Sequence, residues 1–379
     1  AGEKRRKIVP ANNLDMGCNA IRQRILPARN PSSGYPMAYA KVVHENYEFL
    51  EEQLAVTYSE ENWYCFAPDV KATPEFHSRF TQLAFCLPNV VLAGKEYKTD
   101  SAGHYHTHAF FDCLRHLQSK DWNYIIFLQN NDIMIKSNRE IIRIMQTMNG
   151  ANDIELMQCS KDGRCDNLET NLGKLDLCPT TLNASDRNTC GKKNVTWGKG
   201  SVQVTLSRRT ADFLTDNVDY QPLQDELNKN GYGIDEVFLQ TLIVTKELGI
   251  PGSYPYRCLD EHPVSVNKHI FMTRLTHWGG HDDACGSGYW RHGLCVFGVE
   301  DLPYLSGVDY TMANKLMSDF DYAAISCIGE LLYNRTWLGQ DDHPLNIPVY
   351  ENLPLVRLHK LEQTNPANVD ALFKCPVLH

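Results

Sequence analysis

The 379-residue sequence lacks several features that mark common protein classes. No run approaches the 18 or so consecutive apolar residues that a membrane-spanning helix needs. Neither the glycine-rich dinucleotide fingerprint nor the phosphate-binding loop motif occurs, which disfavours dinucleotide cofactors and ATP. Positive charge is also scarce, because the net charge is −9 and the pI is near 5.9. This balance argues against broad binding to nucleic acids or anionic membranes.

Basic residues form only one run, from Glu3 to Lys7, where we expect a solvated tail. Internal repeats and long low-complexity segments are absent as well. His104, His106 and His108 alternate, but no fourth ligand is apparent, so no metal site is expected there.

Cysteine, in contrast, is abundant, with 13 residues spread from Cys18 to Cys375. None of them shows the paired short spacings of a zinc module, so we interpret them as a disulfide framework formed in an oxidising compartment. Three glycosylation sequons, at Asn183, Asn194 and Asn334, agree with that compartment. Because the count is odd, at least one thiol is unpaired or pairs outside this chain.

Strand-like and helical segments alternate along the first third of the chain. Short apolar segments at 37–44, 62–69, 89–94 and 122–132 are separated by amphipathic segments at 45–58, 73–86 and 106–120. This alternation predicts an α/β fold with a mainly parallel central sheet flanked by helices. Ligands bind at the carboxyl ends of such strands, and Asp69 and Asp132 end two of them.

The second half of the chain is less regular. Residues 152–199 are rich in Asn, Asp, Gly, Lys and Cys and predict a long disulfide-pinned excursion. A strand and a helix follow at 201–217, and residues 277–305 form a loop rich in Gly, His and aromatic residues, typical of a binding segment. We expect the chain to close with a helix and an extended proline-containing tail.

Two adjacent carboxylates, Asp235 and Glu236, precede the apolar run VFLQTLIV. The simplest interpretation is a helix start, with Asp235 capping the backbone N–H groups and Glu236 in the first turn, where the helix dipole favours negative charge. That interpretation gives Glu236 no role in catalysis or binding.

Eight short motifs give the chain a wider resemblance. They include NWYCFAPDVKA, YIIFLQNNDIMIKSN, IDEVFLQTL, LTHWGGH, GLCVFGVEDLPYL and ANKL. In order and spacing, from about Met37 to Cys327, they resemble the core-2/I-branching β-1,6-N-acetylglucosaminyltransferases.

The resemblance implies a GT-A-like, disulfide-stapled glycosyltransferase of the Golgi lumen, anchored as a type II membrane protein by a segment ahead of Ala1. It implies an inverting enzyme that takes a UDP-sugar donor and an O-glycan or glycoprotein acceptor, with no metal cofactor. The single Asp-x-Asp of the chain, at 319–321, is expected in a helix as a surface charge cluster. By the same resemblance, residues 1–30 form a stem and residues 31–379 one catalytic domain with an insertion at about 152–199.

Similarity also assigns roles to residues. Glu236 becomes the base that takes the proton of the acceptor hydroxyl, and Asp235 the cap beside it and a sugar-site residue. Lys315 of ANKL matches a family ligand of the diphosphate.

The second diphosphate ligand of the family falls on His292, one residue after Arg291. We favour Arg291, because its permanent charge and fork geometry suit a diphosphate, and keep His292 as the alternative. Val42 and Asp69 are placed around the uridine, and Trp278 beside the sugars.

For the disulfides, similarity pairs Cys18 with Cys86, Cys65 with Cys113, and Cys285 with Cys295. We expect local pairs in the insertion, Cys159 with Cys165 and Cys178 with Cys190. Cys375 is a candidate partner for Cys327, which leaves Cys258 as the odd thiol.

The insertion replaces the acceptor-binding segment of the relatives, so the identity of the acceptor stays open. The donor sugar stays open among N-acetylglucosamine, glucose and xylose, since related scaffolds accommodate each of them by a few contacts. Two alternatives to a β-1,6-branching enzyme are a xylosyltransferase-like enzyme acting on a protein hydroxyl and a non-catalytic lectin-like module.

Overall fold

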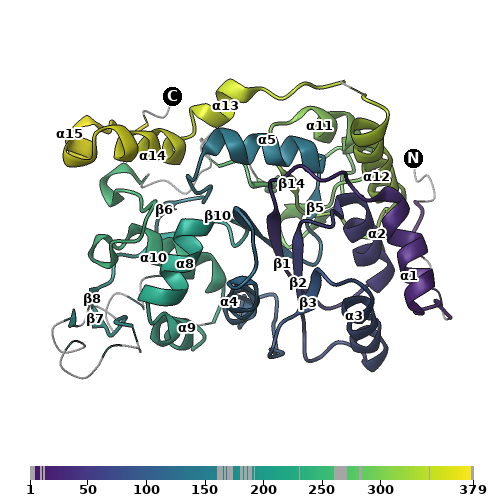
Figure 1. The fold of residues 1–379 in the computed structure, drawn as a ribbon, viewed down its shortest axis with the longest axis horizontal. Helices are drawn as coiled ribbons and strands as arrows, with labels where there is room; N and C mark the ends of the chain where they lie inside the picture. The colour runs from purple at the N-terminus through teal and green to yellow at the C-terminus, as the bar shows by residue number, and fades with distance from the viewer. Residues whose placement is uncertain are drawn as a thin grey trace.

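A five-stranded sheet with the strand order β10-β4-β1-β2-β3 lies at the centre of the protein (Figure 1). Strands β1 to β4 of this sheet are parallel, and β10 runs antiparallel to β4 at one edge. The computed structural model describes residues 5–8, 11, 13–159, 165, 168, 174–179, 182, 186, 190, 191, 193–229, 231–259, 271–280, 284–340 and 342–376. The predicted α/β fold with a mainly parallel sheet is therefore confirmed.

The strands are short, as expected for a buried parallel sheet. The main sheet contains β1 (Met37–Val43), β2 (Trp63–Pro68), β3 (Val90–Leu92), β4 (Tyr124–Gln129) and β10 (Thr205–Ser207). The shorter strands are β5 (Ile133–Met134), β6 (Met157–Gln158), β7 (Lys174–Leu175), β8 (Lys193–Asn194), β9 (Gly198–Lys199), β11 (Arg274–Leu275), β12 (Trp290–Arg291), β13 (Leu294–Cys295) and β14 (Met312–Ala313).

Helices cover both faces of the main sheet. They are α1 (Cys18–Ile25), α2 (Tyr47–Thr57), α3 (Pro74–Cys86), α4 (His106–Leu117), α5 (Asn138–Met148), α8 (Arg208–Asn217), α9 (Gln221–Leu227), α10 (Asp235–Val244), α11 (Leu302–Gly307), α12 (Tyr322–Trp337), α13 (Ile347–Glu351), α14 (Pro354–Thr364) and α15 (Val369–Leu372).

Two hydrophobic cores result from this arrangement. All seven residues of β1 are buried, and alternate side chains point to opposite faces. Tyr39 and Val43 join the core under α1, α2, α3 and α12, whereas Ala38, Ala40 and Val42 join the core under α4, α8, α9 and α10. Figure 1 shows these two groups of helices on opposite sides of β1, β2 and β3. Burial on both faces explains why β1 is apolar in the sequence apart from Lys41.

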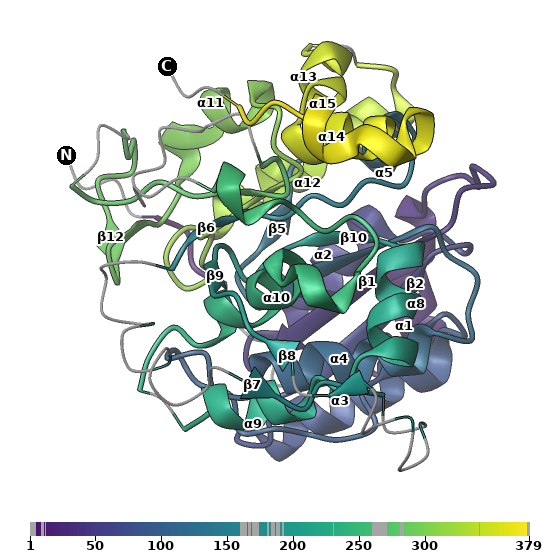
Figure 2. The ribbon, with the colours of Figure 1, turned by 90° about the vertical axis from the view of Figure 1, so that its left-hand side faces the viewer.

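A second, three-stranded sheet with the order β11-β14-β5 extends the carboxyl edge of the main sheet. β5 follows β4 directly, and β14 pairs with both β5 and β11. Helix α10 packs beside β9, and Figure 2 shows the two next to each other. This small sheet brings residues after position 270 to the strand ends of the first third of the chain.

Five of the expected disulfides are confirmed: Cys18–Cys86, Cys65–Cys113, Cys159–Cys165, Cys178–Cys190 and Cys285–Cys295.

The sixth disulfide corrects our expectation for the remaining cysteines. Cys258 is bonded to Cys375, and Cys327 is the free, exposed thiol. The error has a physical origin, since this pair is 117 residues apart in the chain. The C-terminal segment returns to the loop after α10, where Phe373 packs on Tyr254.

The ends of the chain also differ from the sequence expectations. The tail is not extended, because α13, α14 and α15 occupy much of it, and α13 and α14 each have a proline in the first turn. The Asp-x-Asp lies in a turn before α12 rather than in a helix, with Asp321 at the N-cap position. Arg5 is not part of a solvated tail, because it pairs with Glu300 and Asp321 at 2.8 and 2.6 Å.

The stem predicted for residues 1–30 contains α1, which packs on α2 and α3 through the buried Ile21 and Ile25. Among the described residues, no helix has the length and apolar character to cross a membrane.

Candidate functional site

The carboxyl ends of β1 and β2 carry the two residues assigned to the nucleotide. Val42 lies near the end of β1 and is buried, and Asp69 follows β2 and is 2% exposed. The Asp69 carboxylate accepts hydrogen bonds from the Thr99 hydroxyl at 2.5 Å and the Lys71 backbone N–H at 2.7 Å. Asp69 is thus held rigidly at the strand edge where ligands bind in parallel sheets.

Asp132, after β4, is the centre of a buried hydrogen-bond network. Its carboxylate accepts from Asn314 at 2.6 Å, from Gln203 at 2.8 Å and from the Gln129 backbone N–H at 2.5 Å. Its carbonyl accepts from the Lys41 ammonium at 3.1 Å. Burial lowers the pKa of Lys41 to about 8. These contacts satisfy Asp132 internally, so it joins β4, β1 and the Asn314 segment rather than facing a ligand.

Lys315 follows β14 and the buried Asn314 at the same edge of the sheet. Within the described part of the chain, its ammonium has no hydrogen-bond or ion-pair partner. Burial lowers its pKa, and the charges of Arg274 and Arg291 lower it further. The charge of Asp132 partly opposes this lowering. A partly buried ammonium with two cationic neighbours and no directly paired carboxylate is an incomplete electrostatic arrangement, which a bound anion would complete.

Arg291 reaches this cluster from a tight hairpin. β12 and β13 pair through Trp290 with Cys295 and Arg291 with Leu294, and His292 and Gly293 form the two-residue turn. Both turn residues have positive φ, +54° and +77°, as a type I′ turn requires. Arg291 donates to the Met317 sulfur at 3.4 Å, and its charge helps to lower the pKa values of Lys315 and Glu45. Arg291, rather than His292, is therefore the charged neighbour of Lys315.

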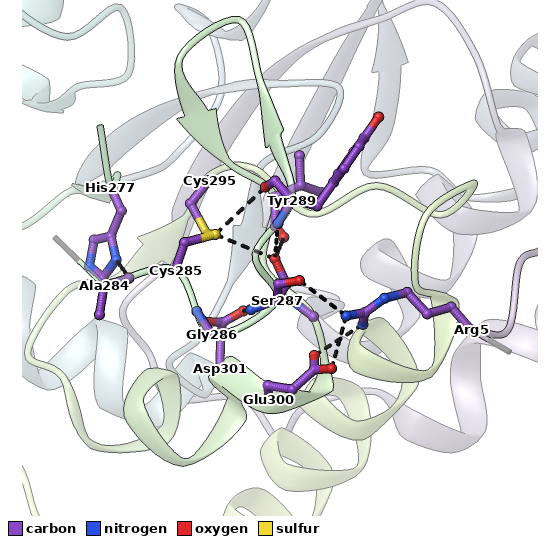
Figure 3. Close-up of a disulfide and its surroundings, with 12 residues drawn as sticks. Arg5, His277, Ala284, Cys285, Gly286, Ser287, Tyr289, Cys295, Glu300 and Asp301 are labelled. Carbon is purple, nitrogen blue, oxygen red and sulfur yellow. Dashed lines mark hydrogen bonds and ion pairs between the residues drawn. A yellow bond between two sulfur atoms is a disulfide. The ribbon is translucent and has the colours of Figure 1, made fainter. Parts of the chain in front are cut away.

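Several contacts anchor this hairpin, and Figure 3 shows them. The Cys285–Cys295 disulfide ties β13 to the preceding loop. The Asp301 carboxylate accepts hydrogen bonds from the backbone N–H groups of Gly286 and Gly298 at 2.6 and 2.8 Å. Arg5 donates to the Ser287 carbonyl at 3.4 Å and pairs with Glu300 (Figure 3). The N-terminal segment thus helps to fix the loop that carries Arg291.

Helix α10 carries the adjacent carboxylates. Nine of its ten residues are buried, and the exception is Glu236, in the first turn. A helix that is apolar on all sides belongs in a core, so Glu236 is the one position where α10 opens toward solvent. The helix dipole at this end favours an ionised carboxylate.

Asp235 does not cap α10, contrary to expectation. The N-cap position is Ile234, which makes no side-chain capping bond. The Asp235 carboxylate instead pairs with His106 Nδ1 of α4 at 2.7 Å. Gly103 makes this approach possible, because its φ is +93° and a Cβ there would lie 2.1 Å from the Asp235 carboxylate. Asp235 therefore fixes the start of α10 against α4 through a tertiary contact.

Glu155 is a neighbour of Glu236 that the sequence interpretation missed. Burial raises the pKa of Glu155, the charge of Arg274 opposes the rise, and the charge of Glu236 adds to it. Gly200 lies between the two backbones: its N–H donates to the Glu236 carbonyl at 2.9 Å, and a Cβ there would lie 1.9 Å from the Glu155 carbonyl. Glu155 was hidden because it falls in the irregular segment after position 152.

Trp278 lies beside the hairpin, bridged to Leu294, and is 38% exposed. The preceding His277 is held by the Ala284 carbonyl at 2.6 Å. An exposed, anchored indole ring offers a face on which a pyranose can stack. Its neighbour Trp290 packs on Gly279 and is equally exposed.

The three alternating histidines have separate partners. His104 pairs with Asp100 at 2.9 Å, and His108 lies 3.4 Å from Asp225, while His106 holds Asp235. His106 and His108 lie on α4 and not on a strand. Among the described residues, no group of three potential metal ligands was found.

The model of the Core-2/I-branching enzyme family matches residues 37–306, more than half of the chain. The chain belongs to the Core-2/I-branching enzyme family. This membership makes it a glycosyltransferase, which uses a sugar donor and a glycan or glycoprotein acceptor.

Two relatives illustrate the likeness. The chain is 27% identical over 320 residues to a human β-1,3-galactosyl-O-glycosyl-glycoprotein β-1,6-N-acetylglucosaminyltransferase 3, covering 81% of this chain and 70% of the relative. It is 29% identical over 310 residues to the zebrafish (Danio rerio) β-1,3-galactosyl-O-glycosyl-glycoprotein β-1,6-N-acetylglucosaminyltransferase 4. This match covers 79% of this chain and 70% of the relative. The matched family segment includes the strands of the main sheet, α10 and the Arg291 hairpin. Lys315 lies nine residues beyond its end.

Proposed function

We propose that this Core-2/I-branching family member is an inverting β-1,6-N-acetylglucosaminyltransferase that transfers the sugar from a UDP-sugar to a hydroxyl of an O-glycan core. The observation that carries the proposal is the Lys315 ammonium, which lies near Arg291 at the carboxyl edge of the sheet without an anionic partner. The names of the two relatives support the sugar, the linkage and the galactosyl-containing acceptor.

In this mechanism Glu236 is the base. The acceptor oxygen bonds to C1 of the donor sugar, the C1–O bond to the diphosphate breaks, and the hydroxyl proton passes to the Glu236 carboxylate. The buried helix fixes the backbone that carries Glu236, and the residue is partly exposed, so an acceptor can approach it. His106 and Asp235 position the turn that carries it.

The leaving UDP gains negative charge as the bond breaks. Lys315 and Arg291 are two fixed cations that stabilise this charge, and we propose that they serve without a metal cofactor. Val42 and Asp69 bind the uridine at the ends of β1 and β2, and Trp278 stacks on a sugar. N-acetylglucosamine is the proposed donor sugar, with glucose as the alternative.

We further propose that the protein works in the Golgi lumen, held there by a membrane anchor ahead of Ala1. Six disulfides support an oxidising compartment. The sequon residue Asn194 is exposed, Asn334 is partly buried on α12, and Asn183 lies outside the described residues.

The test is UDP release by the purified protein in EDTA, over a panel of UDP-sugars, with and without a Galβ1-3GalNAc acceptor. We expect acceptor-dependent release with one donor. Release only with a peptide acceptor would favour the xylosyltransferase-like alternative. UDP binding without turnover on any acceptor would favour the lectin-like alternative, and complete loss of activity in EDTA would contradict metal independence.

A further inference from the structure

Arg274 is a third cation of the site, and its side chain is held in place by neutral groups. It lies on β11 opposite Met312 of β14. Its guanidinium donates to the Asn314 side-chain oxygen at 2.8 Å and to the Ser201 hydroxyl at 3.3 Å. Asn314 is itself fixed by its hydrogen bond to Asp132 at 2.6 Å. The orientation of the guanidinium is therefore set before any ligand binds.

Arg274 makes no ion pair with the described residues, although its charge acts on the Glu155 carboxylate. In the described part of the chain, no carboxylate lies within 4.0 Å of its guanidinium, and its buried Nε–H has no hydrogen-bond partner. A guanidinium has five N–H donors, and two hydrogen bonds leave most of them unused. An unsatisfied buried donor on a charged group is costly, which points to a missing acceptor that carries negative charge.

The neighbours of Arg274 indicate where that acceptor lies. On one side, Arg274 is the charge that lowers the pKa of Lys315 most. On the other side, its charge acts on Glu155, which also senses Glu236.

The hydrogen bonds of Arg274 agree with this. Arg274 donates to Asn314, which precedes Lys315. It also donates to Ser201, which follows the Gly200 that donates to the Glu236 carbonyl. Arg274 therefore lies between the segment of the proposed diphosphate ligand and the segment next to the proposed base.

We infer that Arg274 binds the sugar-proximal phosphate of the donor, a role that rests on the proposed UDP-sugar donor. That phosphate is the anionic group nearest the reacting carbon, so it occupies the space between the diphosphate cations and the base. Arg274 presents a planar fork of N–H donors that suits phosphate oxygens. As the bond from C1 to the phosphate oxygen breaks, the electron pair stays on that oxygen, and Arg274 stabilises the added charge.

The test compares the binding of UDP with that of UMP, which lacks the second phosphate. Titration calorimetry on wild type, Arg274→Gln and Arg274→Lys gives both affinities. We expect Arg274→Gln to weaken UDP binding about tenfold or more, as for the loss of a charged hydrogen bond, and to leave UMP binding unchanged. Arg274→Lys should keep part of the preference for UDP, because it keeps the charge without the fork.

Arg208→Gln is the matched control, because Arg208 is a partly buried arginine on α8 that pairs with Asp212. It removes the same charge outside the site, so UDP and UMP affinities should both stay at wild-type values. Thermal midpoints of all variants separate loss of fold from loss of binding. Arg274→Gln should also lower kcat, which Arg208→Gln should not.

Two outcomes overturn the inference in distinguishable ways. If Arg274→Gln prefers UDP over UMP as strongly as the wild-type protein does, Arg274 only supports Asn314 and Ser201. The donor proposal would then still stand. Failure of the wild-type protein to bind UDP at all would remove the donor proposal and this inference with it.

Discussion

The two charged groups of the site are built in opposite ways. Lys315 follows the end of β14 and Arg291 lies on β12 beside a two-residue turn, and the charge of Arg291 acts on Lys315, which has no direct anionic partner among the described residues. Glu236 is the single open position of a helix that is otherwise buried, at the end where the dipole stabilises its negative charge. The cationic group lacks a direct anionic partner, which a ligand can supply, whereas the helix that carries the carboxylate is fixed by packing. This difference predicts that donor affinity and turnover can be altered separately.

Glu236→Gln gives the largest expected effect. Loss of the base should lower kcat by about 10²- to 10⁴-fold, while the UDP dissociation constant stays near that of wild type. Steady-state kinetics and calorimetry on the same preparation check both values. Glu330→Gln, at an exposed position on α12, is the control. Wild-type turnover by Glu236→Gln would remove the proposed base.

Gly103→Ala tests the packing that holds the carboxylate group. The alanine would have to adopt a φ of +93°, and its Cβ would overlap the Asp235 carboxylate. We therefore expect a loss of about 3 kcal/mol in the free energy of unfolding. Gly339→Ala has φ of +66° with open space around it and should cost about 1 kcal/mol. Urea denaturation measures both values. Equal losses would show that the approach of Asp235 to α4 adds nothing beyond backbone strain.

Lys315→Met tests the cationic group. Removing this charge should weaken UDP binding by about 2 kcal/mol, or roughly 30-fold, with a smaller loss for Arg291→Met because Arg291 is more exposed. Lys246→Met is the control, because Lys246 is exposed and lies two residues after the end of α10. Unchanged UDP affinity in Lys315→Met would contradict its role as a diphosphate ligand.

The pH dependence of UDP binding is the smallest expected effect. The pKa of Lys315 is lowered from 10.5 by burial and by Arg274 and Arg291, so the free protein loses this proton at a lower pH than an ordinary lysine. The protonated amine binds the diphosphate, and UDP affinity should therefore fall as the pH rises through the lowered pKa. Lys315→Arg should abolish that fall, because arginine stays charged. A fall of equal size in Lys315→Arg would assign it to another group.

The parts of the fold that follow local patterns were predictable. β1, β2 and β4 appear as apolar runs between amphipathic helices, and their order along the chain implies a parallel sheet. Asp69 and Asp132 could be placed at the strand ends for the same reason. Asp132, however, proved to be saturated by internal hydrogen bonds, which no local pattern reveals.

The errors concern contacts between distant segments. Asp235 appeared to be a cap because its partner, His106, is 129 residues away. Cys258 appeared to be unpaired because Cys375 returns only through helices α13 to α15, and the first-turn prolines of α13 and α14 suggested an extended tail. Arg274 had no signal at all, since its role depends on Ser201 and Asn314 from two other segments.

The nearly complete burial of α10 has a consequence for mutational tolerance. In a library selected only for folding, position 236 should accept many side chains, while the other positions of the helix should accept few. In a library selected for transfer, position 236 should become the most restricted of the ten. Position 236 would thus be the most tolerant position of the helix under one selection and the least tolerant under the other. This reversal would identify the reactive carboxylate without any assay of the purified protein.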